Sequence, residues 1–291
     1  MKALVAVVGL IIICVIWWDA FETIILPRRV TRRLRLTVLL YRVMWSSWSA
    51  VAKRLRRGKR REAYLSLFGP LSLIVLLTTW AAGQILGFAL LNWALGIKIN
   101  VPEVETNFGS YLYMSGVTFF TLGFGDVIPV RALGRLLTVL EAGTGFGFLA
   151  IVIGYLPVIY QAFSRREVNI SLLDARAGTP GTAVEMLRRH GRSGSMAELN
   201  HLLAEWERWS SDLMESHLSY PVLAYYRSQH DNQSWLAALT TILDTCALVI
   251  VGVDGAPGWQ AQLTFAMARH AVVDIAQIFN ASPEKREVNR V

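Results

Sequence analysis

A glycine-containing loop lies between two long apolar stretches of this chain. No residue is charged between Glu62 and Lys98, and Glu141 is the only charged residue between Arg135 and Arg165. Each stretch exceeds the ~20 residues that a helix needs to cross the hydrocarbon core of a bilayer. Loops survive at membrane depth only where protein buries them or where they line a watery path. The two stretches and their loop therefore predict half of a pore wall.

The loop itself, residues 121–126, has the sequence Thr-Leu-Gly-Phe-Gly-Asp. Stacked backbone carbonyls can replace the hydration shell of a potassium ion. Gly123 and Gly125 reach at low cost the backbone angles that aim successive carbonyls at one axis. Thr121 adds a hydroxyl oxygen at the inner end of the loop, and Asp126 places negative charge at its mouth. The predicted selectivity filter consists of Thr121, Leu122, Gly123, Phe124, Gly125 and Asp126, with K⁺ held at Thr121, Leu122, Gly123 and Phe124.

The residues from Thr118 to Asp126 resemble the TxxTxGYGD signature of tetrameric potassium channels. Phe124 stands where tyrosine is commoner, a variant also found in potassium-selective members. The resemblance covers residues 64–163, about a third of the chain, and is to the two-transmembrane, pore-loop type. It implies a homotetramer that conducts K⁺ passively, with K⁺ as the transported ion and no cofactor. A homotetramer also follows from geometry, since one loop supplies a quarter of each carbonyl ring.

The resemblance also assigns residues 107–120 to a pore helix that ends at the filter. Four such helices direct their C-terminal ends, each with roughly −0.5 elementary charge, at a central cavity and favour a cation there. Tyr113 occupies the aromatic position from which a ring donor reaches Asp126. Val117 departs from the pattern, because some bacterial members carry a glutamate there, so their inactivation behaviour is not implied for this chain.

Residues 135–163 form the expected inner helix, which is interrupted by four glycines and a proline. Glycine weakens a helix by roughly 1 kcal/mol relative to alanine, and proline removes a hydrogen bond and kinks the helix. Gly145 falls at the inner-helix hinge of the family, so we assign it to gating together with Pro157. For the other glycines, close packing between helices is the preferred interpretation. These glycines are Gly143, Gly147 and Gly154.

Glu141 is an acid inside a membrane span, which marks it as a functional residue by default. It either tunes cation occupancy or forms a hydrogen bond behind the filter to the pore helix, where Ser115 and Thr118 are candidate donors. Its place near the outer half of the span favours the second role. Tyr113, Thr118 and Glu141 are therefore the predicted support of the filter.

The positive charge of the chain is concentrated in one segment. Residues 28–61 hold thirteen Lys and Arg and no acidic residue, whereas residues 165–291 hold twelve basic and fourteen acidic ones. Short Lys- and Arg-rich loops stay in the cytoplasm. The segment is too dense in charge to be a voltage sensor, and it does not indicate nucleic-acid binding. It predicts a cytoplasmic or interfacial position and contact with anionic lipid at ~1 kcal/mol per basic residue.

An apolar run at residues 3–18 precedes this basic segment. It extends toward residue 26 if Asp19 and Glu22 sit at the membrane interface, and the basic segment then places the N-terminus outside. A cleavable signal peptide is the alternative. No small-x-small cleavage site follows, and cleavage would translocate thirteen positive charges. We therefore expect a retained first transmembrane helix.

From Glu167 onward the composition is that of a soluble helical domain. It has no Gly-x-Gly-x-x-Gly after a strand, no metal-ligand spacing and no nucleophile–base constellation, so we expect no enzyme. The run 246–253 is apolar enough to be a buried helix or a strand. The domain could bind a cytoplasmic ligand, assemble the tetramer, or both.

The sequence as a whole predicts an all-α protein of the inner membrane. Its segments are an N-terminal transmembrane helix (1–27), a basic segment (28–62), a pore domain (63–165) and a helical cytoplasmic domain that gates the pore (166–291). The expected function is a potassium channel. A weakly selective cation channel and a membrane-anchored sensor with a vestigial pore remain as alternatives.

Overall fold

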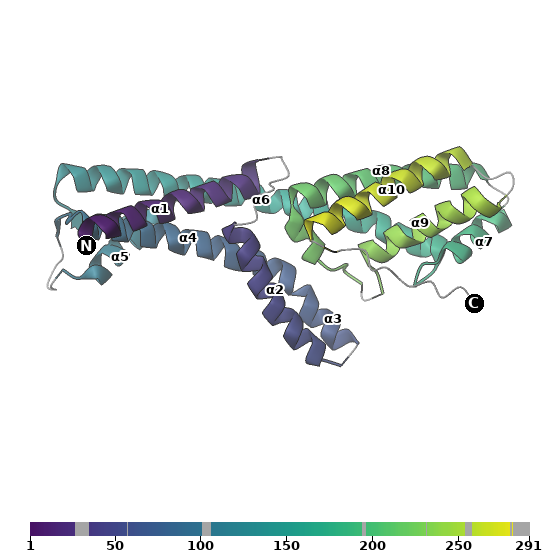
Figure 1. Cartoon of the computed structure of the whole chain (residues 1–291), viewed down its shortest axis with the longest axis horizontal. Helices are drawn as coiled ribbons and strands as arrows, with labels where there is room; N and C mark the ends of the chain where they lie inside the picture. Colours follow the sequence, from purple (N-terminus) through teal and green to yellow (C-terminus); the bar gives the residue numbers. More distant parts are fainter. Residues whose placement is uncertain are drawn as a thin grey trace. The chain divides into compact units, whose positions relative to one another are not determined.

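The chain is an all-α membrane protein apart from two short strands, and its computed structural model divides into two compact units (Figure 1). Unit 1 comprises Met1–Val51 and Pro70–Val158, and unit 2 comprises Ala52–Gly69 and Ile159–Val291. The structure describes residues 1–26, 35–56, 58–100, 106–193, 196–230, 232–253, 258–279 and 281. Arg28, Arg29, Arg32 and Arg33 of the basic segment lie outside these ranges.

Unit 1 contains the predicted pore and the first helix. In chain order its elements are α1 (Lys2–Ala20), the π-helical turn η1 (Phe21–Ile25), α2 (Leu36–Arg54), α4 (Phe68–Ala94), β1 (Ile99–Asn100), α5 (Phe108–Phe119), β2 (Ile128–Pro129) and α6 (Ala132–Ala177). The unit boundaries fall within α2, α4 and α6, so α4 and α6 run from one unit into the other without a break.

Helices α1 and α4 approach each other at three glycines. A Cβ added to Gly9 would lie 2.7 Å from the carbonyl oxygen of Gly87, and one added to Gly83 would lie 2.1 Å from the Ile16 side chain. Gln84 lies between the two α4 glycines and donates a hydrogen bond to the carbonyl of Ile13 (3.1 Å). Small residues four apart are the usual means by which membrane helices pack closely. The first helix is thus an integral part of unit 1, held by a spacing that the sequence analysis did not use.

A buried acidic pair closes the end of α1. Asp19 and Glu22 are 3% and 8% exposed, so they are buried inside the unit. Asp19 accepts hydrogen bonds from the indole of Trp80 (2.9 Å) and from the Thr37 hydroxyl. Arg35 lies 3.4 Å from Glu22 and 4.0 Å from Asp19. Because buried carboxylates require partners, this cluster joins α1, the start of α2 and α4.

The two strands connect the start and the exit of the pore loop. They pair antiparallel, with Ile99 opposite Pro129 and Asn100 opposite Ile128. Gly134 at the start of α6 packs against the end of this sheet, since a Cβ there would lie 2.8 Å from Pro129. The sheet therefore anchors both ends of the pore-loop region to each other.

Unit 2 is a helical bundle built on the C-terminal part of α6. Its elements are α3 (Lys59–Ser66), that part of α6, α7 (Ala183–Ser193), α8 (Met196–Ser219), the 3₁₀ turn η2 (Pro221–Tyr225), α9 (Trp235–Gly252) and α10 (Gly258–Ile278). In Figure 1, α10 (yellow) lies along α8 (green), with α9 beside them. The core includes Leu173 of α6, Leu203 and Trp206 of α8, and Ile242 of α9. The run 246–253, left open between helix and strand, is helical to Gly252.

Four described helical stretches are long and apolar enough to cross a membrane: Lys2–Ile25, Lys59–Ala94, Ala132–Ala177 and Trp235–Gly252. The first three are the spans that the sequence predicts. The fourth is α9, which contributes Leu239, Ile242 and Cys246 to the core of unit 2. The membrane character of the chain therefore rests on the first three, since α9 is apolar because it is a core helix.

Candidate functional site

The predicted pore helix is α5, and its first turn is fixed by a capping box. Asn107 is the N-cap: its side chain accepts a hydrogen bond from the Ser110 amide (3.2 Å), and the Ser110 hydroxyl accepts one from the Asn107 amide (3.4 Å). This reciprocal pair satisfies two amides that the helix leaves without partners. The predicted range 107–120 matches α5 together with its two capping residues.

The C-terminal end of α5 leads directly into the loop 121–126. The Leu122 amide donates to the carbonyl of Val117 (2.9 Å), and the Thr121 amide donates to that of Thr118 (3.0 Å). This double closure is a Schellman motif, which requires a left-handed residue after the helix and usually places glycine there. Here Thr121 occupies the position, with φ of 55°. The Thr118 carbonyl thus helps to close the end of α5, and the role of Thr118 as support of the filter stays a prediction.

Thr121 is the only non-glycine residue with positive φ among those that the structure describes. A left-handed conformation costs an L-residue roughly 1–2 kcal/mol, and such strain gathers at functional sites. Glycine would remove this cost but would also remove the hydroxyl. The presence of threonine at this cap is explained if its side-chain oxygen has a role in the site.

Positive φ recurs at every second residue of the loop. Gly123 has φ of 62° and Gly125 has φ of 77°, whereas Leu122 and Phe124 do not have positive φ. Alternation between left- and right-handed residues gathers successive amide N–H groups on one side of the chain, which leaves the carbonyls to the other. Within this chain a Cβ on either glycine would meet no atom within 4 Å. Both glycines are therefore required for their backbone angles and not for space.

The filter aspartate has the partner expected for it. The Tyr113 hydroxyl donates a hydrogen bond to a carboxylate oxygen of Asp126, with 2.7 Å between the two oxygens. Tyr113 lies on α5, and Asp126 follows the last glycine of the loop, so this bond joins the middle of α5 to the end of the loop 121–126. The contact is the one that the resemblance implies.

Glu141 is fully buried in unit 1, and so is Ser115 on the pore helix. The Ser115 hydroxyl, a predicted donor to Glu141, has no hydrogen-bond partner in the part of the chain that the structure describes. Both carboxylate oxygens of Glu141 lack a hydrogen-bond partner in the described part of the chain. The role of Glu141 as support of the filter stays a prediction, and the hydrogen bond predicted for it is not formed among the described residues.

Gly145 packs directly against the end of the pore helix. A Cβ added to Gly145 would lie 1.9 Å from the carbonyl oxygen of Phe119, the last residue of α5. At Gly143 and Gly154, by contrast, an added Cβ would meet nothing within 4 Å in this chain. Within one chain, Gly145 therefore has the close-packing role that we predicted for the other glycines of this helix. Its role as a hinge stays a prediction, and α6 continues as one helix through Pro157.

Unit 2 has an open pocket of about 540 Å³ among α3, the end of α6 and the residues before α9. Polar side chains line it, among them Lys59, Asp174 and Gln233. The described residues contain no group of three or more His, Cys, Asp or Glu that could hold a metal ion. The predicted cytoplasmic ligand stays a prediction.

Comparison with known proteins supports ion conduction by the segment that contains the loop 121–126. Residues 74–161 match the family model described as an ion channel. The matched segment contains α5, the loop 121–126 and the first part of α6. Ion conduction is therefore the function that the match supports for this part of the chain.

Two curated proteins show similarity to the chain. An uncharacterized membrane protein, YdjJ of Bacillus subtilis (strain 168), is 24% identical over 192 residues, which is 65% of this chain and 55% of that protein. Protein LctB of Geobacillus stearothermophilus is 31% identical over 87 residues, 26% of this chain and 64% of that protein. The chain thus spans less than two thirds of the length of either relative. No solved structure matches.

Proposed function

We propose that four copies of this chain form a potassium channel in the inner membrane. Potassium passes down its electrochemical gradient between four copies of the loop 121–126, without a cofactor. The observation that carries this proposal is the positive φ at Thr121, Gly123 and Gly125, directly after a capped pore helix. The ion-channel match at residues 74–161 supports it independently.

The proposal includes an orientation and a control element. The basic segment 28–61 lies on the cytoplasmic side, near anionic lipid, which places the N-terminus outside and residues 166–291 inside. Unit 2 is built on the C-terminal part of α6, so any rearrangement of its core acts on the inner helix. The helical C-terminal domain therefore gates the pore.

Flux through reconstituted protein tests this proposal. The purified full-length chain is placed in liposomes with and without anionic lipid, and K⁺ and Na⁺ flux are compared, with barium as blocker. Selective, barium-sensitive K⁺ flux is the expected result. Equal Na⁺ flux would identify a weakly selective cation channel, and no flux from a folded tetramer in either lipid would favour a sensor with a vestigial pore.

A pair of glycine variants tests the filter assignment. Gly123→Ala forces a Cβ into a left-handed residue, at a cost of roughly 1–2 kcal/mol, and is expected to abolish selective flux. Gly191→Ala is the matched control, because Gly191 lies within α7 with no atom within 4 Å of an added Cβ. Potassium-selective flux through the Gly123→Ala protein would refute the filter.

A further inference from the structure

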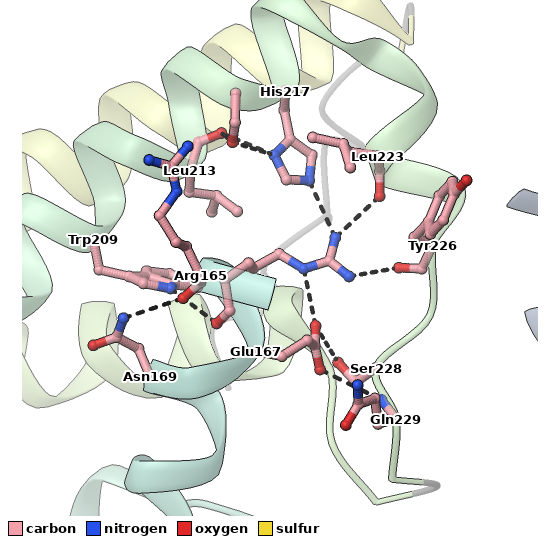
Figure 2. A network of polar contacts seen from close by, with 12 residues as sticks. Arg165, Glu167, Asn169, Trp209, Leu213, His217, Leu223, Tyr226, Ser228 and Gln229 are labelled. Atoms are coloured by element: carbon pink, nitrogen blue, oxygen red, sulfur yellow. Dashed lines mark hydrogen bonds and ion pairs between the residues drawn. The ribbon is translucent and has the colours of Figure 1, made fainter. Parts of the chain in front are cut away.

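A buried arginine follows the membrane-spanning part of α6. Arg166 is 4% exposed. Its guanidinium donates hydrogen bonds to the carbonyl of Tyr226 (2.7 Å) and to that of Leu223 (3.0 Å). Figure 2 shows both carbonyls as part of one polar network. A buried guanidinium needs such partners, so the segment containing Leu223 and Tyr226 is fixed to α6.

Glu167 and His217 belong to the same polar network (Figure 2). Glu167 accepts a hydrogen bond from the Arg166 Nε (3.0 Å) and others from the Ser228 hydroxyl (3.3 Å) and the Gln229 amide (3.4 Å). His217 lies 3.3 Å from the guanidinium through its Nε2. The segment is therefore held to consecutive residues of α6 at both of its ends.

His217 takes part in this network as a neutral ring. Its burial and the neighbouring Arg166 guanidinium lower the pKa of His217 to about 3. The Nδ1 lies 2.9 Å from the carbonyl of Leu213 and so carries the proton, which leaves Nε2 to accept from Arg166. The network thus keeps one arrangement over the physiological pH range.

The same segment also contacts the start of the outer helix. The ring of Tyr226 packs against Gly69, since a Cβ added to Gly69 would lie 2.7 Å from a ring carbon. The rings of Tyr225 and Phe68 are 5.0 Å apart between centroids, and Arg227 forms an ion pair with Glu62. These contacts are made on α3 and on the first turn of α4, more than 150 residues earlier in the chain.

We propose that residues 220–229, the coupling segment, fix the cytoplasmic end of the inner helix to that of the outer helix and so transmit the state of the C-terminal bundle to the pore. This inference rests on the proposed channel function. The segment contacts α6 through hydrogen bonds to a buried charge, α3 through the Arg227–Glu62 ion pair, and α4 through aromatic rings. A movement of α6 relative to α4 must therefore carry the segment along or break the Arg166 network.

Three variants of the full-length protein test the coupling. Arg166→Met removes the charge and leaves two carbonyls unpaired. Gly69→Ala perturbs the contact of the coupling segment with α4, since the new Cβ meets the Tyr226 ring. Alanine is otherwise the better helix residue, so any destabilisation of the segment must come from that contact. Arg188→Met is the matched control, because Arg188 makes only an exposed pair with Glu185 in α7.

Hydrogen exchange measures the coupling without any need for conduction. In both Arg166→Met and Gly69→Ala, we expect amide exchange to rise at least tenfold at both 62–69 and 221–229, with no such rise in Arg188→Met. A rise confined to the mutated end overturns the proposal. If Arg166→Met does not fold, Gly69→Ala decides the matter alone.

Potassium flux in liposomes measures the consequence for the pore. Both test variants are expected to change steady-state K⁺ flux more than threefold with an unchanged K⁺/Na⁺ ratio. A change below threefold in folded tetramers overturns the link to the pore. If the unmodified protein conducts no K⁺ while exchange still spreads between the two ends, the proposed function fails and the coupling stands.

Discussion

The contact of Gly145 with the end of the pore helix gives a prediction whose size follows from the structure. In Gly145→Ala the new Cβ would lie 1.9 Å from the Phe119 carbonyl oxygen. Carbon and carbonyl oxygen come no closer than roughly 3.3 Å even in attractive contacts, so the two backbones must separate by about 1.4 Å. Neither partner can relieve the clash by a rotamer change, because both atoms belong to backbone.

Overpacking of this kind costs typically 1–3 kcal/mol, and a rigid backbone contact belongs at the upper end of that range. The displaced atom is the last carbonyl of α5, and the filter starts two residues later. A misplacement of about 1 Å at a functional site can cost 100-fold in activity. We therefore expect Gly145→Ala to lower the thermal stability of the tetramer and to reduce K⁺-selective flux by at least tenfold.

The assay compares melting in detergent and K⁺/Na⁺ flux in liposomes for Gly145→Ala and for Gly143→Ala. Gly143 is the matched control on the same helix, since an added Cβ there has no atom within 4 Å in this chain. Alanine at Gly143 should leave flux unchanged and add a little helix stability. Wild-type melting and selectivity in Gly145→Ala would refute the close contact.

Three further predictions concern other parts of the chain. Tyr113→Phe removes the hydrogen bond to Asp126, which should cost the loop 121–126 about 0.5–1.5 kcal/mol of stability. We expect K⁺ flux in liposomes to decay sooner in this variant than in the wild type. An unchanged decay of K⁺ flux would contradict this prediction. Asp19→Asn removes one charge from a buried cluster but leaves Glu22 3.4 Å from Arg35, so it should destabilise the protein by about 1–3 kcal/mol in detergent melts, whereas an unchanged melt would show that the Asp19 charge is dispensable. His217 has a pKa lowered to about 3 in the folded state. Because the unfolded chain then binds more protons between about pH 3 and 6.5, stability should rise with pH across that window by up to ~1.4 kcal/mol per unit, and His217→Gln should remove this slope.

The local part of the site was predictable because its geometry depends on neighbouring residues. Two glycines at alternate positions specify the backbone of the loop, and a hydroxyl on Tyr113 lies thirteen residues from Asp126, within reach across one short helix. What required the structure was contact between distant parts. The pairing of Glu62 with Arg227 joins residues 165 apart, and neither side chain belongs to a periodic pattern.

For glycines, too, the sequence does not identify the contacts that distant parts of the chain make. A sequence can say that Gly145 weakens a helix, but it does not show which atom lies opposite its missing Cβ. The Gly83–Gly87 spacing is present in the sequence, but only the structure identifies α1 as the helix that packs against these glycines. Burial of Asp19 could not be foreseen either, because Trp80, which binds it, lies in a stretch without charge.

The glycine contact between α1 and α4 couples the tilt of α1 in the bilayer to the tilt of α4. The apolar stretch Lys2–Ile25 has 24 residues, roughly 36 Å of helix against about 30 Å of hydrocarbon, so it must tilt or thicken the lipid around it. Leu4, Val7 and Ile11 are exposed on α1. With backbone lying on backbone at Gly9 and Gly87, no flexible layer of side chains absorbs a change in the tilt of α1 there. A change in membrane thickness that tilts α1 would therefore also tilt α4, so α4 would respond to bilayer thickness through its contact with α1.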